Sequence, residues 1–148
     1  MTVVESVIAS GGAAPPSTPP AARVTAMPGD ANPYGDIFGG WLMAQMDLAA
    51  SLVASRRVRG RVATVAVDGM TFLRPVAVGD EVSIYGAVLS VGRTSIKINV
   101  EAWRRDRHGD EEEMVTRATF VFVAIGVDRR PVNIPGATGE APLSATPI

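Results

Sequence analysis

Hydrophobic and polar residues alternate along much of the second half of the chain, a pattern that predicts β-strands. The alternation is clearest in residues 94–104, where one set of side chains is apolar and the other mainly polar. Further strands are predicted for residues 24–27, 61–70, 80–91 and 115–127. The apolar set is Ile96, Ile98, Val100 and Ala102, and the opposite set is Ser95, Lys97, Asn99, Glu101 and Trp103.

One stretch, residues 37–57, predicts a helix of about 30 Å. It contains no proline, and leucine, methionine, glutamine and alanine favour helix formation. Asp36 is placed to cap its start, and Gly60 to stop it. Its expected core-facing side chains are Leu42, Met43, Met46 and Val53.

These elements predict an α+β domain in which an antiparallel sheet wraps around one long central helix. The folded domain is expected to span residues 23–135. Residues 1–22 are rich in proline and small residues and are interpreted as a disordered N-terminal tail, and residues 136–148 as a flexible C-terminal tail.

Composition excludes several classes of function. The 148 residues include no cysteine and a single histidine, His108, so neither a disulfide scaffold nor a metal site is expected. His108 lies in the charged segment 104–114, which is interpreted as a hairpin tip. The 14 basic and 15 acidic residues nearly balance, which argues against nucleic-acid or membrane partners. With no secretion signal and no apolar run long enough to span a membrane, a cytoplasmic location is expected.

A carboxylate stands out on the predicted helix. Gly40, Ala44, Asp47 and Ser51 form one stripe, and the other three members are small. A buried carboxylate costs several kcal/mol unless it is paired or hydrogen-bonded, and such groups are typical of active-site bases. Asp47 is therefore a candidate general base. Alternatively, it is a satisfied structural acid or lies at an exposed edge.

Two consecutive glycines, Gly39 and Gly40, lie at the expected helix start. Free N–H groups at a helix N-terminus attract negative charge, as an oxyanion hole for acyl transfer requires. An ordinary glycine-rich helix entry is the alternative. Asp36 and Asp47 are separated by about 16 Å along a helix axis, so they do not form a pair within one subunit. A dimer could combine one chain's helix with the other chain's loop.

Polar residues that could hold a phosphate or a polar amide chain occur at two further places. Arg93, Thr94 and Ser95 combine a cation with two hydroxyl groups at a strand start, and Arg74 lies in an extended loop before a proline. A polar hairpin tip explains the first group equally well.

Three segments in order resemble one known family: residues 27–47 (MPGDANPYGDIFGGWLMAQMD), 67–80 (VDGMTFLRPVAVGD) and 91–103 (VGRTSIKINVEAW). They resemble acyl-CoA thioesterases of the YciA type, in the hotdog-fold superfamily. The resemblance implies a hotdog fold, a double-hotdog homodimer and commonly a hexamer of three dimers. It implies hydrolysis of acyl-CoA to CoA and a carboxylic acid. Coenzyme A would be part of substrate and product, with no separate cofactor.

The resemblance also implies roles for individual residues. Asp47 would act as general base or nucleophile, and Gly39 and Gly40 would polarise the thioester carbonyl. Asp36 occupies the position at which related double-domain enzymes carry an asparagine that takes part in the reaction. Coenzyme A contacts would come from strand and loop residues near the dimer seam, for which the candidates are Asn32, Arg74, Arg93, Thr94 and Ser95.

Two other functions compete with hydrolysis. A hydratase or dehydratase of the same fold generally uses an active-site histidine, and His108 is in a charged hairpin. A non-catalytic acyl-CoA-binding protein or sensor would normally lack the helix acid, whereas Asp47 is present.

Overall fold

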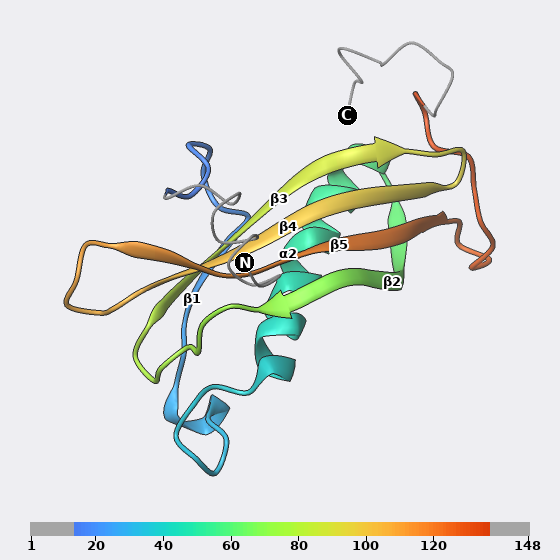
Figure 1. Cartoon of the computed structure of the whole chain (residues 1–148). Coiled ribbons are helices and arrows are strands. Elements are labelled where there is room, and N and C mark those ends of the chain that lie inside the picture. Colours follow the sequence, from blue (N-terminus) through green and yellow to red (C-terminus); the bar gives the residue numbers. More distant parts are fainter. Residues whose placement is uncertain (1–13, 137–148) are drawn as a thin grey trace.

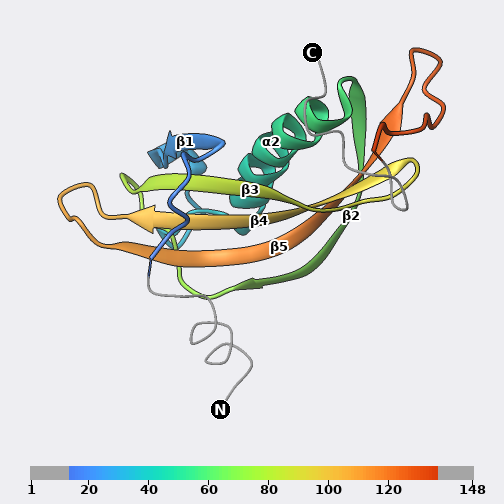
Figure 2. The same ribbon diagram turned by 90° about the horizontal axis from the view of Figure 1, so that it is seen from above.

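The structure is a computed structural model, and it describes residues 14–136. One long helix, α2 (Gly39–Val58), lies against a curved five-stranded antiparallel sheet (Figures 1 and 2). The expected α+β architecture is therefore confirmed. The strands are β1 (Ala22–Thr25), β2 (Arg61–Phe72), β3 (Glu81–Val91), β4 (Ser95–Arg105) and β5 (Glu112–Ile125), and a short 3-10 helix, η1 (Pro28–Asp30), follows β1.

The sheet has the strand order β1-β3-β4-β5-β2, so the strand that directly follows the helix forms one edge. β2 pairs with β5 on one side, and the short β1 pairs with β3 at the other edge. Figure 2 shows the helix on the concave side of the sheet. The helix crosses this face and packs against β2, β3, β4 and β5.

The core lies between the helix and the concave face of the sheet. The alternation predicted in β4 is confirmed, since all four apolar members are fully buried. The helix packs through small residues, which allow a close approach to the strands. Met43, however, is 39% exposed and Val53 only partly buried, so the prediction that Met43 belongs to the core is wrong. The buried helix residues are Leu42, Met46, Ala49, Ala50, Ala54 and Val58.

The helix starts later than the sequence predicts, and Asp36 does not cap it. Phe38 is the cap residue, and its side chain cannot accept a hydrogen bond. Asp36 belongs instead to the preceding loop, where its backbone bridges to Ala77. At the other end, Arg59 rather than Gly60 adopts the left-handed conformation, with φ of 60°.

Strand β2 contains two irregularities in its pairing with β5. Thr64 pairs with Phe122 and Ala66 with Val121, so Val65 is an extra residue in β2. Such a bulge shifts the alternation of side chains by one position. Thr64 and Val67 therefore both face the helix although they are three residues apart. A second irregularity lies between Asp68 and Thr71.

Strands β4 and β5 extend into the segment predicted as a hairpin tip. Ion pairs accompany this extension, since Arg104 Nε donates to Asp80 Oδ2 at 2.7 Å and Arg105 binds both oxygens of Glu81 at 2.8 and 2.9 Å. The carboxylate of Asp80 is nearly inaccessible and also accepts the backbone N–H of Ala77. The hydrogen bond to Asp80 raises the pKa of the Arg104 guanidinium.

The first strand begins earlier than residue 24. Ala22 pairs with Ile84, and the N–H of Ala21 donates to the Ile84 carbonyl at 2.8 Å. These two residues of the expected tail thus join the sheet, while residues 1–13 and 137–148 lie outside the described residues. Within residues 14–136, no helix combines the length and apolar character needed to cross a membrane.

Candidate active site

Asp47 lies on the side of α2 that faces the edge strand β2. Its carboxylate is partly buried, and Thr64 Oγ1 donates a 2.6 Å hydrogen bond to its Oδ1. Together they line an open pocket of about 370 Å³, called here the Asp47 pocket. Its other lining residues are Gly40, Met43, Ala44, Val67 and Phe120.

Thr64 is a site residue that the sequence analysis missed. A simple alternation along β2 does not predict that both Thr64 and Val67 face the helix, because the extra residue Val65 interrupts it. A threonine seventeen residues after Asp47 carries no local motif. The bulge is therefore what brings the hydroxyl to the carboxylate.

Gly39 and Gly40 are the first two residues of the helix. Their N–H groups therefore lack the helical carbonyl partner, four residues earlier, that later N–H groups have. A Cβ at Gly39 would lie 3.2 Å from Cζ of Phe72, whereas a Cβ at Gly40 would meet nothing within 4 Å. Gly40 lines the Asp47 pocket, and Gly39 lines a second pocket. The helix N-terminus therefore lies between two pockets.

The second pocket, called here the helix-start pocket, also has a volume of about 370 Å³. Arg74 is its one charged lining residue, and its Nε lies 2.8 Å from Glu113 Oε2. Arg74 Nη1 also donates to the Met114 carbonyl at 3.1 Å. The charge of Arg74 is thus compensated within the chain. The remaining lining residues are Ile37, Phe38, Gly39, Leu42, Phe72, Leu73, Pro75, Val76 and Val115.

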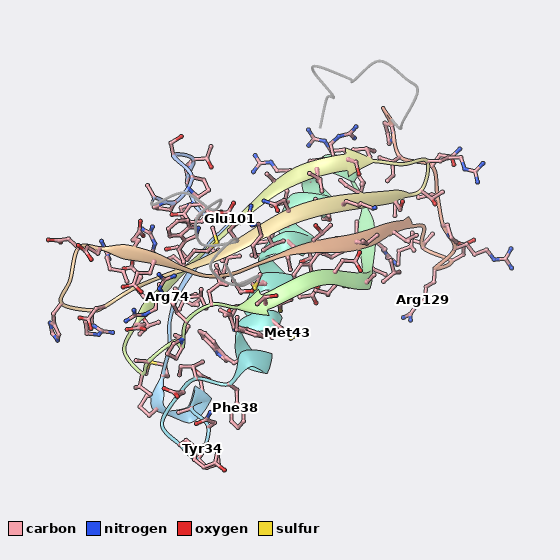
Figure 3. The ribbon with its side chains drawn as sticks, in the orientation of Figure 1. Tyr34, Phe38, Met43, Arg74, Glu101 and Arg129 are labelled. Carbon is pink, nitrogen blue, oxygen red and sulfur yellow. The ribbon has the colours of Figure 1, made fainter. Side chains whose placement is uncertain are left out.

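The loop before the helix is organised by Asn32. Its Oδ1 accepts the backbone N–H groups of Tyr34 and Asp36 at 2.9 and 3.1 Å. Within residues 14–136 its side-chain NH₂ group has no hydrogen-bond partner, and neither has the exposed carboxylate of Asp36. Figure 3 shows Tyr34 and Phe38 together at this end of the molecule. The loop therefore presents a free amide donor and a free acid.

The candidates Arg93, Thr94 and Ser95 lie at the other end of the sheet. Ser95 pairs with Val123, whereas Arg74 contacts Met114, so nine residues of β5, or about 30 Å, separate them. The β3–β4 turn is held there by the C-terminal segment, since Ile134 N–H donates to the Arg93 carbonyl. Within one chain, the structure therefore does not bring Arg74 together with the residues of this turn.

The single histidine lies apart from the pockets. His108 is exposed in the β4–β5 turn, where its N–H donates to Asp106, in agreement with the sequence interpretation. Among the residues that the structure describes, no three His, Cys, Asp or Glu side chains are grouped so as to hold a metal ion.

Known proteins resemble this chain over most of its described length. A sequence profile of the thioesterase superfamily matches residues 34–110. The acyl-CoA thioester hydrolase YciA of Salmonella typhimurium is 47% identical over 116 residues, which cover 76% of this chain and 87% of that protein. A hexameric thioesterase from Yersinia pestis superposes with a TM-score of 0.77 at 46% identity, covering 81% of this chain and 98% of that one.

A second solved structure, a hexameric broad-specificity acyl-coenzyme A thioesterase, has a TM-score of 0.77 at 42% identity. The alignment covers 88% of this chain and 89% of that structure. The resemblance noted in the sequence is thereby confirmed, and with it the hotdog fold. The chain belongs to the thioesterase superfamily and is an acyl-CoA thioester hydrolase of the YciA type.

Proposed function

We propose that Asp47 is the central catalytic group in the hydrolysis of acyl-CoA thioesters to free coenzyme A and a carboxylic acid. The observation that supports this most directly is the carboxylate itself, which Thr64 orients in an open pocket. A general base or nucleophile must be held within reach of the reacting carbon. Asp47 is the only acid that lines either pocket among those found in residues 14–136 beside the helix start.

In the general-base route, Asp47 takes a proton from water as the water oxygen attacks the thioester carbon. The carbonyl oxygen becomes negatively charged and is stabilised by the N–H groups of Gly39 and Gly40. The tetrahedral intermediate then breaks its C–S bond, and the proton passes from Asp47 to the departing thiolate. In the nucleophile route, a carboxylate oxygen of Asp47 attacks the thioester carbon, and the C–S bond breaks to release the coenzyme A thiolate, which takes a proton from water. Water then hydrolyses the resulting anhydride at the carboxyl carbon of Asp47.

Single turnover in isotopically labelled water separates these two routes. The general-base route places the water oxygen in the released acid at the first turnover. The nucleophile route places it on Asp47, and the first acid released then carries an unlabelled oxygen from the enzyme. Mass spectrometry of the acid and of the peptide containing Asp47 distinguishes the two.

The site is proposed to be shared between two subunits. Gly40 and Asp47 lie seven residues apart, which is about 10 Å along the helix axis. One thioester carbonyl cannot contact the N–H groups and the carboxylate across that distance. A homodimer supplies the missing group by placing Asp47 of one chain opposite the Gly39–Gly40 turn of the other. The free amide of Asn32 and the carboxylate of Asp36 would reach the same site from the loop.

We also propose how the subunits assemble and which residues contact coenzyme A. The solved relatives named above are hexamers, and a trimer of dimers is the proposed assembly of this chain. Arg93, Thr94 and Ser95, about 30 Å from Arg74 within one chain, are proposed to contact coenzyme A near the dimer seam. The proposed location is cytoplasmic.

The decisive experiment measures coenzyme A release from a panel of acyl-CoAs with a thiol reagent. The chain has no cysteine, so the enzyme gives no background signal. Asp47→Ala should fold, as judged by circular dichroism, and lose turnover. Full activity in folded Asp47→Ala would overturn the mechanism. Asp36→Ala, measured beside it, loses activity if the loop acid takes part and retains it if the acid serves only the loop.

A complementation experiment tests the shared site. Asp47→Ala and Asn32→Ala each disable both sites of a homodimer. If each site combines Asp47 of one chain with Asn32 of the other, a mixed dimer has one intact site. Co-expression should then restore about a quarter of wild-type activity by random pairing. A mixture no more active than its parents would place both residues of a site in one chain.

A further inference from the structure

We infer that the acyl chain of the substrate occupies the helix-start pocket, that the ring of Phe72 limits its length, and that the preferred acyl groups are short to medium and uncharged. The inference rests on the proposed function, since it assigns the acyl part of the thioester. The helix N-terminus lies between the two pockets.

Each glycine of the helix start faces a different pocket. Gly40 lines the pocket that contains Asp47, and Gly39 lines the pocket that contains Phe72. A thioester carbonyl held by these two N–H groups has two substituents, the acyl chain and the sulfur of coenzyme A, which leave the carbonyl carbon in different directions. The two pockets therefore provide separate paths for them.

The lining of the helix-start pocket matches a hydrocarbon chain. Its side chains come from the helix start, the end of β2 with the loop that follows it, and Val115 of β5, and nearly all of them are apolar. Its volume of about 370 Å³ is near the lower end of the range for small-molecule sites. A pocket of this size suits a short or medium chain.

Phe72 is the residue placed to set the length of that chain. Its ring lies against Gly39, because Cζ, Cε2 and Cε1 all fall within 3.6 Å of the position of a Cβ there. The ring is 44% exposed and lines the pocket, so it forms part of the pocket wall rather than part of the core. A smaller side chain would open this wall without removing a buried packing residue.

Charge in the pocket argues against acidic acyl groups. Arg74 is the one cation in the lining, and its guanidinium is bound to Glu113 and to the Met114 carbonyl. A terminal carboxylate on the acyl chain would find no free cation in this pocket and would lose its hydration on entry. Neutral chains are therefore preferred to dicarboxylic ones of the same length.

The test measures kcat/KM for saturated acyl-CoAs from acetyl to dodecanoyl with wild type, Phe72→Ala, Phe72→Leu and Phe72→Trp. Each additional buried methylene changes binding about fourfold. Phe72→Ala should raise the dodecanoyl-to-hexanoyl ratio at least about tenfold, Phe72→Leu less, and Phe72→Trp should lower it. Inhibition by free coenzyme A should stay constant, because it carries no acyl chain.

Met43→Ala is the matched test of the Asp47 pocket. It should leave the ranking of chain lengths unchanged. A ranking that follows Met43 and ignores Phe72 would overturn the inference and place the acyl chain beside Asp47. Wild type should also prefer hexanoyl-CoA to adipoyl-CoA, and equal rates would contradict the charge argument. Wild type that hydrolyses no acyl-CoA would instead refute the proposed function.

Discussion

The hydroxyl of Thr64 lies 2.6 Å from Oδ1 of Asp47, so a strand residue fixes the orientation of the helix carboxylate. The partners belong to different elements, β2 and α2, and both line the Asp47 pocket. A hydroxyl that donates to one oxygen leaves the other oxygen of the carboxylate available for water or for the thioester carbon.

Thr64→Val should therefore lower kcat without unfolding the protein. A hydrogen bond to a charged group is worth about 1.5–3 kcal/mol, which corresponds to a loss of roughly 10- to 150-fold if it acts mainly in the transition state. Thr64→Ser keeps the hydroxyl and should retain most of the activity. Steady-state kinetics at matched thermal stability checks this, and equal kcat for the valine and serine variants would contradict it.

Gly40→Ala should raise the stability of the chain and lower its activity. A Cβ at this helical position meets nothing within 4 Å, so alanine should stabilise the chain by about 0.5–1 kcal/mol through helix propensity. The new methyl group would enter the Asp47 pocket, and kcat/KM should fall at least about tenfold. Thermal unfolding and kinetics on the same preparation provide the measurement. A stable variant with full activity would show that substrate does not approach Gly40.

Glu113→Gln should change selectivity toward acidic acyl groups. It removes the negative charge that lies 2.8 Å from Arg74 and leaves the guanidinium uncompensated at the helix-start pocket, held by the Met114 carbonyl. The ratio of kcat/KM for adipoyl-CoA to that for hexanoyl-CoA should rise about tenfold, within the range expected for a charge-assisted hydrogen bond. Glu111→Gln, in the exposed turn, is the control and should leave the ratio unchanged.

Asp80→Ala should be strongly destabilising. The buried carboxylate holds both Arg104 and the turn at Ala77, and breaking a buried ion pair costs about 3–5 kcal/mol. For a chain of this size the expected fall in Tm is roughly 6–20 °C. Asp128→Ala removes an exposed pair with an N–O distance of 4.0 Å and should change Tm little. Equal shifts in the two variants would refute the argument.

The start of the sheet can be tested by two truncations. A chain that begins at residue 23 lacks the pairing of Ala22 with Ile84 and the bond from Ala21 N–H. A chain that begins at residue 14 keeps both. The shorter chain should have the lower Tm, by a few degrees, because each hydrogen bond contributes about 1 kcal/mol. Identical unfolding curves would mean that the fold starts at residue 23, as the sequence alone suggests.

Much of the fold can be predicted because its signals are local. The alternation from Ile96 to Ala102 and the proline-free stretch after Gly39 each follow from neighbouring residues. The capping role predicted for Asp36 is wrong for the same reason. A good capping residue expresses only a local preference, and here Asn32 Oδ1 accepts the backbone N–H of Asp36 within the loop.

Contacts between distant parts of the chain could not be predicted in this way. The Asp47–Thr64 hydrogen bond depends on a bulge, and the Arg74–Glu113 pair joins residues far apart in sequence. Met43 was expected in the core because it is apolar. Its exposure is decided by the direction in which the helix faces the sheet, which composition does not reveal.

The extra residue gives β2 one residue more than its pairing with β5 uses. If Val65 were removed, Thr64 and Ala66 would become neighbours and would still oppose Phe122 and Val121, which are already neighbours in β5. Thr64 and Val67 would then share a face by ordinary alternation, two positions apart. Because a bulge bends a strand and increases its twist, the loss of Val65 would act on the local course of β2 beside the helix and not on which side chains face it.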